Sequence, residues 1–151
     1  MKIISHRGCE NGPNKKIENK PDQINKMLKE GFDVEVDVFS DKLGNLYLGH
    51  DTLVHKVGID FLKRPGLWCH AKDAMALSIM IENNVHCFWH QEDEFTITSQ
   101  KYIWAYPGKH TSGKNTIMLY PERYEEEDCC KYFGICTDYP YRFLKEKEKK
   151  L

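Results

Sequence analysis

Residues 32–39 alternate apolar and acidic side chains, and no other part of the sequence restricts the fold as strongly. Three valines in this run alternate with three carboxylates. A period of two is typical of a β-strand, because successive side chains point to opposite faces. Apolar residues at helical spacing precede the run, between Pro21 and Gly31, which suit the first turn and the end of a helix. With residues 2–5 as an earlier strand, this order predicts a parallel β-α-β unit.

The rest of the chain repeats short apolar runs with fewer helical patterns between them. We expect further strands at residues 67–70, 86–90, 95–98, 102–106, 116–120 and 134–137, a short extension at 46–49, a short helix near Phe61, and helices at 73–84 and 121–132. Residues 141–151 are expected to form a final helix or a frayed end. An ordinary (β/α)8 barrel needs roughly 200 residues or more, and this chain has 151. The sequence therefore predicts an α/β fold: a compact, trimmed (β/α)8 TIM-type barrel with several outer helices shortened or missing, in a single domain over residues 1–151.

The charge balance restricts the partners. Twenty-two Lys and Arg residues face 23 Asp and Glu residues, for a formal net charge of −1. This leaves no electrostatic basis for non-specific binding to nucleic acid or to an anionic membrane. Hydrophobic residues make up 40% of the chain, which excludes a wholly disordered protein. We expect the ligand to be a small soluble molecule.

The first residues and the cysteines indicate the compartment. The start of the sequence carries neither the apolar core of a signal peptide nor a membrane span. Six cysteines occur without C-x-x-C spacing, so we expect reduced thiols rather than a disulfide framework, with a redox-active Cys129-Cys130 pair as the alternative. These features predict a cytoplasmic protein without stable membrane insertion.

Four short polar segments carry the chemistry: Ser5-His6-Arg7-Gly8, Glu18-Asn19, Glu35-Val36-Asp37 and His50-Asp51. Metal-assisted cleavage of a phosphodiester needs carboxylates for a cation, a planar cation for the phosphate oxygens, and groups that exchange protons near neutral pH. Two carboxylates spaced two apart on a strand share one face, with about 6.6 Å between their Cα atoms. One hard cation can bridge them; the alternative is a solvated acidic face on an edge strand.

In order along the chain, these segments resemble the glycerophosphodiester phosphodiesterase family, within the phosphatidylinositol-phospholipase-C-like barrels. The matching segments are residues 4–8, 17–19, 34–38, 44–51 and the Gly-Ile-x-Thr-Asp-x-Pro segment at 134–140. The resemblance implies His6 and His50 as general acid and base, and Arg7 and Lys72 as phosphate ligands. It implies supporting roles for Glu18, Asn19 and Asp51, although surface salt bridges are the alternative for Arg7 and Glu18.

The resemblance also implies a divalent cation, Mg²⁺, Ca²⁺ or Mn²⁺, held by Glu35 and Asp37. The family places a glutamate as third ligand two residues before the lysine of the third strand. This chain has His70 there, before Lys72. Imidazole suits Mn²⁺ or Zn²⁺ better than Mg²⁺ or Ca²⁺. We therefore expect His70, or a water in its place, to complete the metal site, and a ligating His70 to shift the metal preference.

Two further segments are candidates for the substrate rim. His90 and Gln91 follow one predicted strand, and Trp104 and Tyr106 end another. They would bind the alcohol side of a diester, with aromatic rings stacking on a sugar or base; the alternative is that they cover the core. The segment 108–115 spells G-x-x-x-x-G-K but has Asn115 in place of Ser or Thr and precedes a strand, so we do not interpret it as a phosphate loop.

These observations predict a metal-dependent phosphodiesterase that cleaves a small soluble phosphodiester, similar to a glycerophosphodiester, by acid-base catalysis with two histidines. Two alternatives remain open at this point. The first is a phosphate- or glycan-binding module that has kept the barrel and lost turnover. The second is a phospholipase-like lyase that releases a cyclic phosphate.

Overall fold

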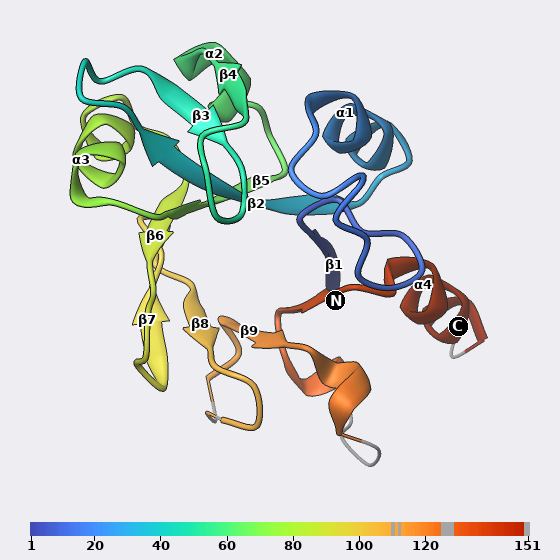
Figure 1. Ribbon diagram of the computed structural model, residues 1–151. Coiled ribbons are helices and arrows are strands. Elements are labelled where there is room, and N and C mark those ends of the chain that lie inside the picture. Colours follow the sequence, from blue (N-terminus) through green and yellow to red (C-terminus); the bar gives the residue numbers. More distant parts are fainter. Residues whose placement is uncertain (110, 112, 125–128, 150–151) are drawn as a thin grey trace.

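The computed structural model describes residues 1–109, 111, 113–124 and 129–149, and it has a mixed α/β fold (Figure 1). The strands are β1 Lys2–His6, β2 Asp33–Ser40, β3 Leu46–Leu48, β4 His55–Val57, β5 Leu67–Ala71, β6 Cys87–Trp89, β7 Phe95–Ile97, β8 Ile103–Ala105, β9 Thr116–Leu119 and β10 Gly134–Thr137. The α-helices are α1 Pro21–Lys29, α2 Ile59–Leu62, α3 Ala74–Glu82 and α4 Pro140–Lys149. No helix of the described residues is long and apolar enough to cross a membrane.

All ten strands belong to one sheet. Seven of the described strands run parallel, in the order β6-β5-β2-β1-β10-β9-β8. Strand β7 pairs antiparallel with β8, and β3 and β4 form an antiparallel extension on the end of β2. The sheet is not closed by strand pairing in the described part of the chain, because β6 pairs with β5 alone and β7 with β8 alone. The two edges are nevertheless near each other, since the Ser99 N–H donates to the Cys87 carbonyl at 2.8 Å.

The helices are distributed unevenly along the sheet. Helices α1 and α3 follow the parallel strands β1 and β5, and α4 packs near β1 (Figure 1). Between β6 and β9 the described residues contain no helix. The described helices are therefore fewer than the parallel strands, and the segment from β6 to β9 has none.

Each face of the sheet has its own core. The valines of β2 lie on the face covered by helices, buried with Ile24 and Met27 of α1 and Met80 of α3. The opposite face carries a second cluster of apolar side chains: Ile4, Trp68, Phe88, Trp104, Ile117 and Cys136. Residues two positions further along the same strands share this face. They lie toward the carboxyl ends of the strands and include His6, His70, His90, Tyr106 and Asp138.

Several predicted elements differ from the structure. The helix predicted over 121–132 is wrong for the described residues: Pro121–Arg123 and Cys129–Lys131 form short 3-10 turns, and 125–128 lie outside the described residues. The first turn ends because Tyr124 has an extended backbone. Strand β4 was not predicted, since His55–Val57 contains one apolar residue and so shows no apolar run. The expected final helix is α4, with 150 and 151 outside the described residues, as are 110 and 112 of the segment 108–115.

Candidate active site

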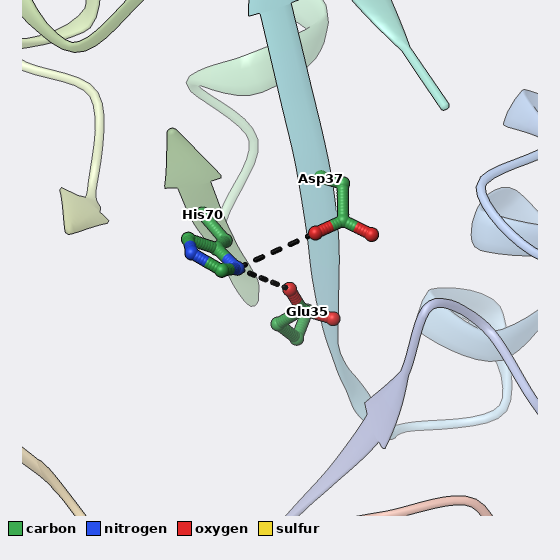
Figure 2. Close-up of side chains that lie close together, drawn as sticks. All are labelled: Glu35, Asp37 and His70. Atoms are coloured by element: carbon green, nitrogen blue, oxygen red, sulfur yellow. Dashed lines mark ion pairs between the residues drawn. The ribbon is translucent and has the colours of Figure 1, made fainter. Parts of the chain in front are cut away.

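Glu35 and Asp37 of β2 lie together with His70 of β5 (Figure 2). The parallel register places His70 directly beside Asp37, so the two side chains share a face of the sheet. Nδ1 of His70 lies 3.3 Å from Oδ1 of Asp37 and 3.8 Å from Oε1 of Glu35. One ligand atom from each of the three residues lies within 4.8 Å of the others. The structure thus brings the three predicted metal ligands together.

The donor set of these three residues fits a divalent cation. Nε2 of His70 lies 2.8 Å from the carbonyl oxygen of His90, and because a carbonyl only accepts, Nε2 carries the hydrogen. In the neutral ring, Nδ1 then directs a lone pair at the two carboxylates. Oδ1 of Asp37 is buried and accepts no hydrogen bond from the described residues. A cation that accepts two oxygens and one nitrogen would satisfy these groups.

Asp37 divides its two oxygens between different partners. Oδ2 faces Nε of Arg7 at 2.8 Å and accepts from the Asn19 amide at 3.1 Å. The Asn19 side-chain oxygen in turn accepts from the Asp37 backbone N–H at 2.9 Å. Oδ1 faces His70, with Nζ of Lys72 3.6 Å away. Arg7 and Asn19 therefore hold Oδ2 of Asp37, whereas Oδ1 is available to a cation.

Burial and charge act differently on the two carboxyl groups. Burial and the neighbouring charge of Asp37 raise the pKa of Glu35. Burial also opposes ionisation of Asp37, but His70 and the charges of Arg7 and Lys72 outweigh it, so the pKa of Asp37 falls below its ordinary value. Without a cation, Glu35 therefore takes up a proton more readily than Asp37.

Arg7 lies between the two carboxylates. Burial lowers the pKa of Arg7, but the charges of Asp37 and Glu35 outweigh burial, and the pKa lies above its ordinary value. Its backbone is in the left-handed region, with φ 53°, and its N–H donates to Oε2 of Glu35 at 3.3 Å. Asn19 is also left-handed, with φ 56°, and its N–H donates to the Arg7 carbonyl at 2.9 Å. A backbone hydrogen bond thus joins two residues with strained, left-handed backbones beside the site.

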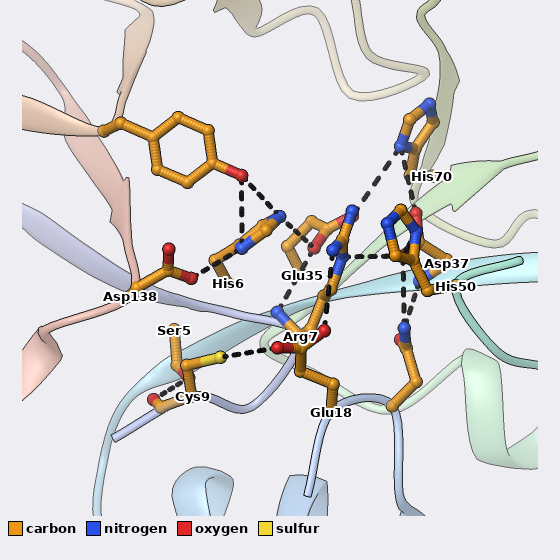
Figure 3. Close-up of polar contacts among 12 residues, drawn as sticks. Ser5, His6, Arg7, Cys9, Glu18, Glu35, Asp37, His50, His70 and Asp138 are labelled. Carbon is orange, nitrogen blue, oxygen red and sulfur yellow. Dashed lines mark hydrogen bonds and ion pairs between the residues drawn. The ribbon is translucent and has the colours of Figure 1, made fainter. Parts of the chain in front are cut away.

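His6 forms a second polar group with two residues from the end of the chain (Figure 3). Nδ1 of His6 lies 2.7 Å from Oδ1 of Asp138. Since a carboxylate only accepts, Nδ1 donates and Nε2 keeps its lone pair. Nε2 lies 3.0 Å from the hydroxyl oxygen of Tyr120 and 3.8 Å from Oε2 of Glu35. The imidazole is therefore held in one tautomer with its basic nitrogen toward the carboxylate pair.

His50 lies on the Asp37 side of the site, and Figure 3 shows it across Arg7 from His6. Its Nδ1 lies 3.8 Å from Oδ2 of Asp37, and its Nε2 lies 3.8 Å from Oδ1 of Asp51. The His50 side chain is 39% exposed and that of Asp51 is 76% exposed. His50 thus faces solvent and the carboxylates at once, whereas Asp51 supports it only loosely.

Glu18 contacts the site through Arg7. Oε2 of Glu18 lies 3.5 Å from a terminal guanidinium nitrogen of Arg7, while Oε1 accepts from the Asn14 backbone N–H at 2.9 Å. The ion pair is mostly buried. Glu18 therefore pairs with Arg7 in a mostly buried ion pair and not in the surface salt bridge that was the alternative.

A cavity of about 240 Å³ opens beside the polar groups. The predicted rim residues His90, Trp104 and Tyr106 line it, together with His6, Arg7, Glu35, His70, Pro107, Leu119, Tyr120 and Arg123. Trp104 is buried and stacks on Phe88 with 4.5 Å between ring centroids, so it forms the floor. Gln91 is exposed and is not among the lining residues. Three of the four predicted rim residues thus border one cavity next to the candidate metal ligands.

The sequence did not assign two residues that the structure adds to the site. Asp138 belongs to the segment 134–140, where a signal was present but no role followed from it. Tyr120 precedes Pro121 and has a left-handed backbone, with φ 51°, and neither feature indicates a site on its own. Both residues reach His6 because β10 pairs with β1 and β9 pairs with β10.

No protein-family model, no curated protein and no solved structure matches this chain. The functional argument therefore depends on the geometry of the site and on the motifs that the sequence carries.

Proposed function

We propose that this protein is a metal-dependent phosphodiesterase that cleaves a small soluble phosphodiester. One observation carries the proposal: the ligand atoms of Glu35, Asp37 and His70 converge within 4.8 Å. An arginine and two histidines surround this cluster, with His6 beside Glu35 and His50 beside Asp37. Charge stabilisation, phosphate binding and proton exchange are the three functions that such a reaction requires.

We also propose that the curved sheet is a (β/α)8 barrel reduced in its second half. The seven parallel strands and the position of the polar groups at their carboxyl ends support this. Barrel enzymes of this type keep their chemistry at that end.

A divalent cation bound by Glu35, Asp37 and His70 would supply Lewis-acid stabilisation of the charge on the phosphate. Arg7 and Lys72 would bind the phosphate oxygens, since both cations lie against Asp37. His6 exchanges a proton through Nε2, because Asp138 holds Nδ1 in the donating form. His50 exchanges the second proton from the opposite side of Arg7. Water is the attacking group in a complete hydrolysis.

One observation favours a second candidate, a phosphate-binding module without turnover. The Tyr120 hydroxyl lies 3.0 Å from Nε2 of His6, the nitrogen that the reaction needs. If the protein binds phosphate without turnover, the Tyr120 hydroxyl would remain on Nε2 of His6 when a phosphodiester binds, and Nε2 would not exchange a proton. Turnover of a generic diester distinguishes the two candidates.

The test compares hydrolysis of bis-p-nitrophenyl phosphate by the wild type and by Glu35→Gln, both in Mn²⁺. We expect release of p-nitrophenolate by the wild type and a loss on the order of a hundredfold or more in the variant, because one ligand of the cation is removed. Asp60→Asn, which changes an exposed carboxylate on α2, is the control and should match the wild type. Equal rates in Glu35→Gln and wild type would exclude this site, and Mn²⁺ binding without any turnover would favour the binding module.

A further inference from the structure

His90 has an unusual environment at the end of β6. The residue is 8% exposed, and neither ring nitrogen has a hydrogen-bond partner within the described part of the chain. A buried polar group without a partner costs free energy, and such groups in native proteins call for an explanation. Its backbone carbonyl accepts from His70, so the residue is fixed next to the candidate metal ligands.

The unpartnered ring belongs to the cavity of about 240 Å³ described above, which we term the His90 cavity. His6, Arg7, Glu35 and His70 also line it, so an organic group in the cavity would adjoin a phosphate held by Arg7. A hydroxyl group both donates and accepts. It therefore pairs with an imidazole nitrogen whichever tautomer is present.

The other walls of the His90 cavity restrict the shape of the ligand. Tyr106 is 45% exposed, and its ring is inclined by 61° to the His90 ring, with 5.7 Å between centroids. The rings of Tyr120 and His6 are inclined by 83°. Neither pair offers parallel faces that would enclose a flat nucleobase. A puckered ring with hydroxyls pointing in several directions suits these walls better.

The size of the His90 cavity also restricts the ligand. Sites for drug-sized ligands have volumes of about 300–1,000 Å³. The His90 cavity is smaller than this range. It suits a single ring rather than a lipid chain or an oligosaccharide.

We propose that the His90 cavity binds a single sugar ring, so that the substrate is a sugar phosphodiester. His90 hydrogen-bonds a sugar hydroxyl through a ring nitrogen, and Tyr106 covers one side of the ring. This inference rests on the proposed phosphodiesterase function, because it names the alcohol that the enzyme recognises. His90 determines specificity and takes no part in proton exchange.

The test uses two chromogenic diesters that differ only in the hydroxyls and the ring oxygen. Glucose 6-(p-nitrophenyl phosphate) and cyclohexylmethyl p-nitrophenyl phosphate share the methylene link, the phosphate and the leaving group. A site that hydrogen-bonds hydroxyls strongly rejects an analogue without them. We expect kcat/KM of the wild type to favour the glucose diester by about tenfold or more. This preference should fall to within about threefold in His90→Phe.

Two further variants separate recognition from folding. Tyr106→Ala changes a half-exposed wall residue and should reduce the preference for glucose without unfolding the protein. Gln91→Ala changes the exposed neighbour of His90 outside the lining residues and should keep the full preference. Equal preference in His90→Phe, Tyr106→Ala and the wild type would overturn the sugar proposal.

A binding measurement distinguishes failure of this inference from failure of the proposed function. Calorimetry with glucose 6-(methyl phosphate) and cyclohexylmethyl methyl phosphate reports recognition without turnover. In one outcome, the wild type hydrolyses neither chromogenic diester but binds glucose 6-(methyl phosphate) at least tenfold more tightly than cyclohexylmethyl methyl phosphate. If His90→Phe also loses this binding preference, the sugar site is supported and the proposed hydrolysis is wrong. If both chromogenic diesters are hydrolysed at similar kcat/KM, hydrolysis stands and the sugar site is wrong. If the wild type binds the two methyl phosphates equally tightly, the sugar proposal is wrong.

Discussion

At the scale of single residues, His6 shows how one contact sets the chemistry of a side chain. The carboxylate of Asp138 holds Nδ1 at 2.7 Å and so directs the lone pair of Nε2 toward Glu35. The same relation between a carboxylate and an imidazole fixes the tautomer of the general base in the serine protease triad. In the proposed mechanism, Asp138 is therefore a positioning residue that acts through His6.

Asp138→Asn tests this role. An asparagine can donate to Nδ1 and so stabilise the wrong tautomer, and we expect kcat to fall by about 10²- to 10⁴-fold. The affinity for Mn²⁺, measured by calorimetry, should stay within a few fold because Asp138 is not among the three clustered ligand residues. An unchanged kcat would remove Asp138 from the mechanism.

In the proposed metal site, we expect His70 to determine which cation is preferred. It supplies a nitrogen donor and no negative charge, where a glutamate would supply oxygen and a charge. We expect wild-type activity to rank Mn²⁺ and Zn²⁺ above Mg²⁺ and Ca²⁺, and His70→Glu to reverse that order. Activity measured in each of the four ions, in both proteins, checks this expectation. The same ranking in both proteins would show that His70 does not bind the cation.

At the scale of elements, a tight turn holds His50 after β3. A Cβ atom on Gly49 would lie 2.0 Å from the Thr52 carbonyl oxygen, which is shorter than any contact a methyl group tolerates. The Gly49 N–H also donates to the Asp37 carbonyl at 3.3 Å. Gly49 thus connects the turn that carries His50 to the strand that carries Asp37.

Gly49→Ala should move the His50 turn while leaving most of the fold in place. We expect kcat to fall at least about tenfold, since a displacement of about 1 Å is enough for a large loss of catalysis. Circular dichroism should retain the wild-type spectrum. Gly58→Ala is the control, because a Cβ atom at Gly58 meets no other atom within 4 Å. Full activity in Gly49→Ala would show that the position of His50 is unimportant.

Elements with a strong local pattern could be predicted from the sequence. The alternation in 32–39 predicted β2, and with it the shared face of Glu35 and Asp37. Strand β4 has one apolar side chain, and the 3-10 turns are too short to repeat a helical period. The pairing of Asp138 with His6 joins residues 132 positions apart, so it depends on strand order and not on local pattern.

At the scale of the whole molecule, the two ends of the sheet differ in their ionisation. At the end away from the candidate site, His86 lies against Trp68, with 4.3 Å between ring centroids. Burial lowers the pKa of His86 from 6.5 to about 4. Below pH 6.5 the unfolded chain therefore binds a proton at His86 that the folded chain does not bind. Stability should fall as the pH decreases from 6.5 toward 4.

His86→Phe removes this titration and tests the pH dependence. We expect the midpoint of urea unfolding to fall less between pH 7 and pH 5 in the variant than in the wild type, because phenylalanine takes up no proton. Comparing the change in each protein with its own value at pH 7 corrects for any difference in packing. Identical changes in both proteins would show that His86 contributes nothing to the acid sensitivity.

Turnover in a metal-stripped protein tests most directly whether Glu35, Asp37 and His70 form a metal centre for phosphodiester cleavage. The protein is treated with a chelator, dialysed, and titrated with Mn²⁺ while hydrolysis of bis-p-nitrophenyl phosphate is followed. The metal-centre account predicts no hydrolysis in the stripped protein and a rise that saturates at one Mn²⁺ per chain, absent in Asp37→Asn. Full hydrolysis in the presence of excess chelator would contradict it.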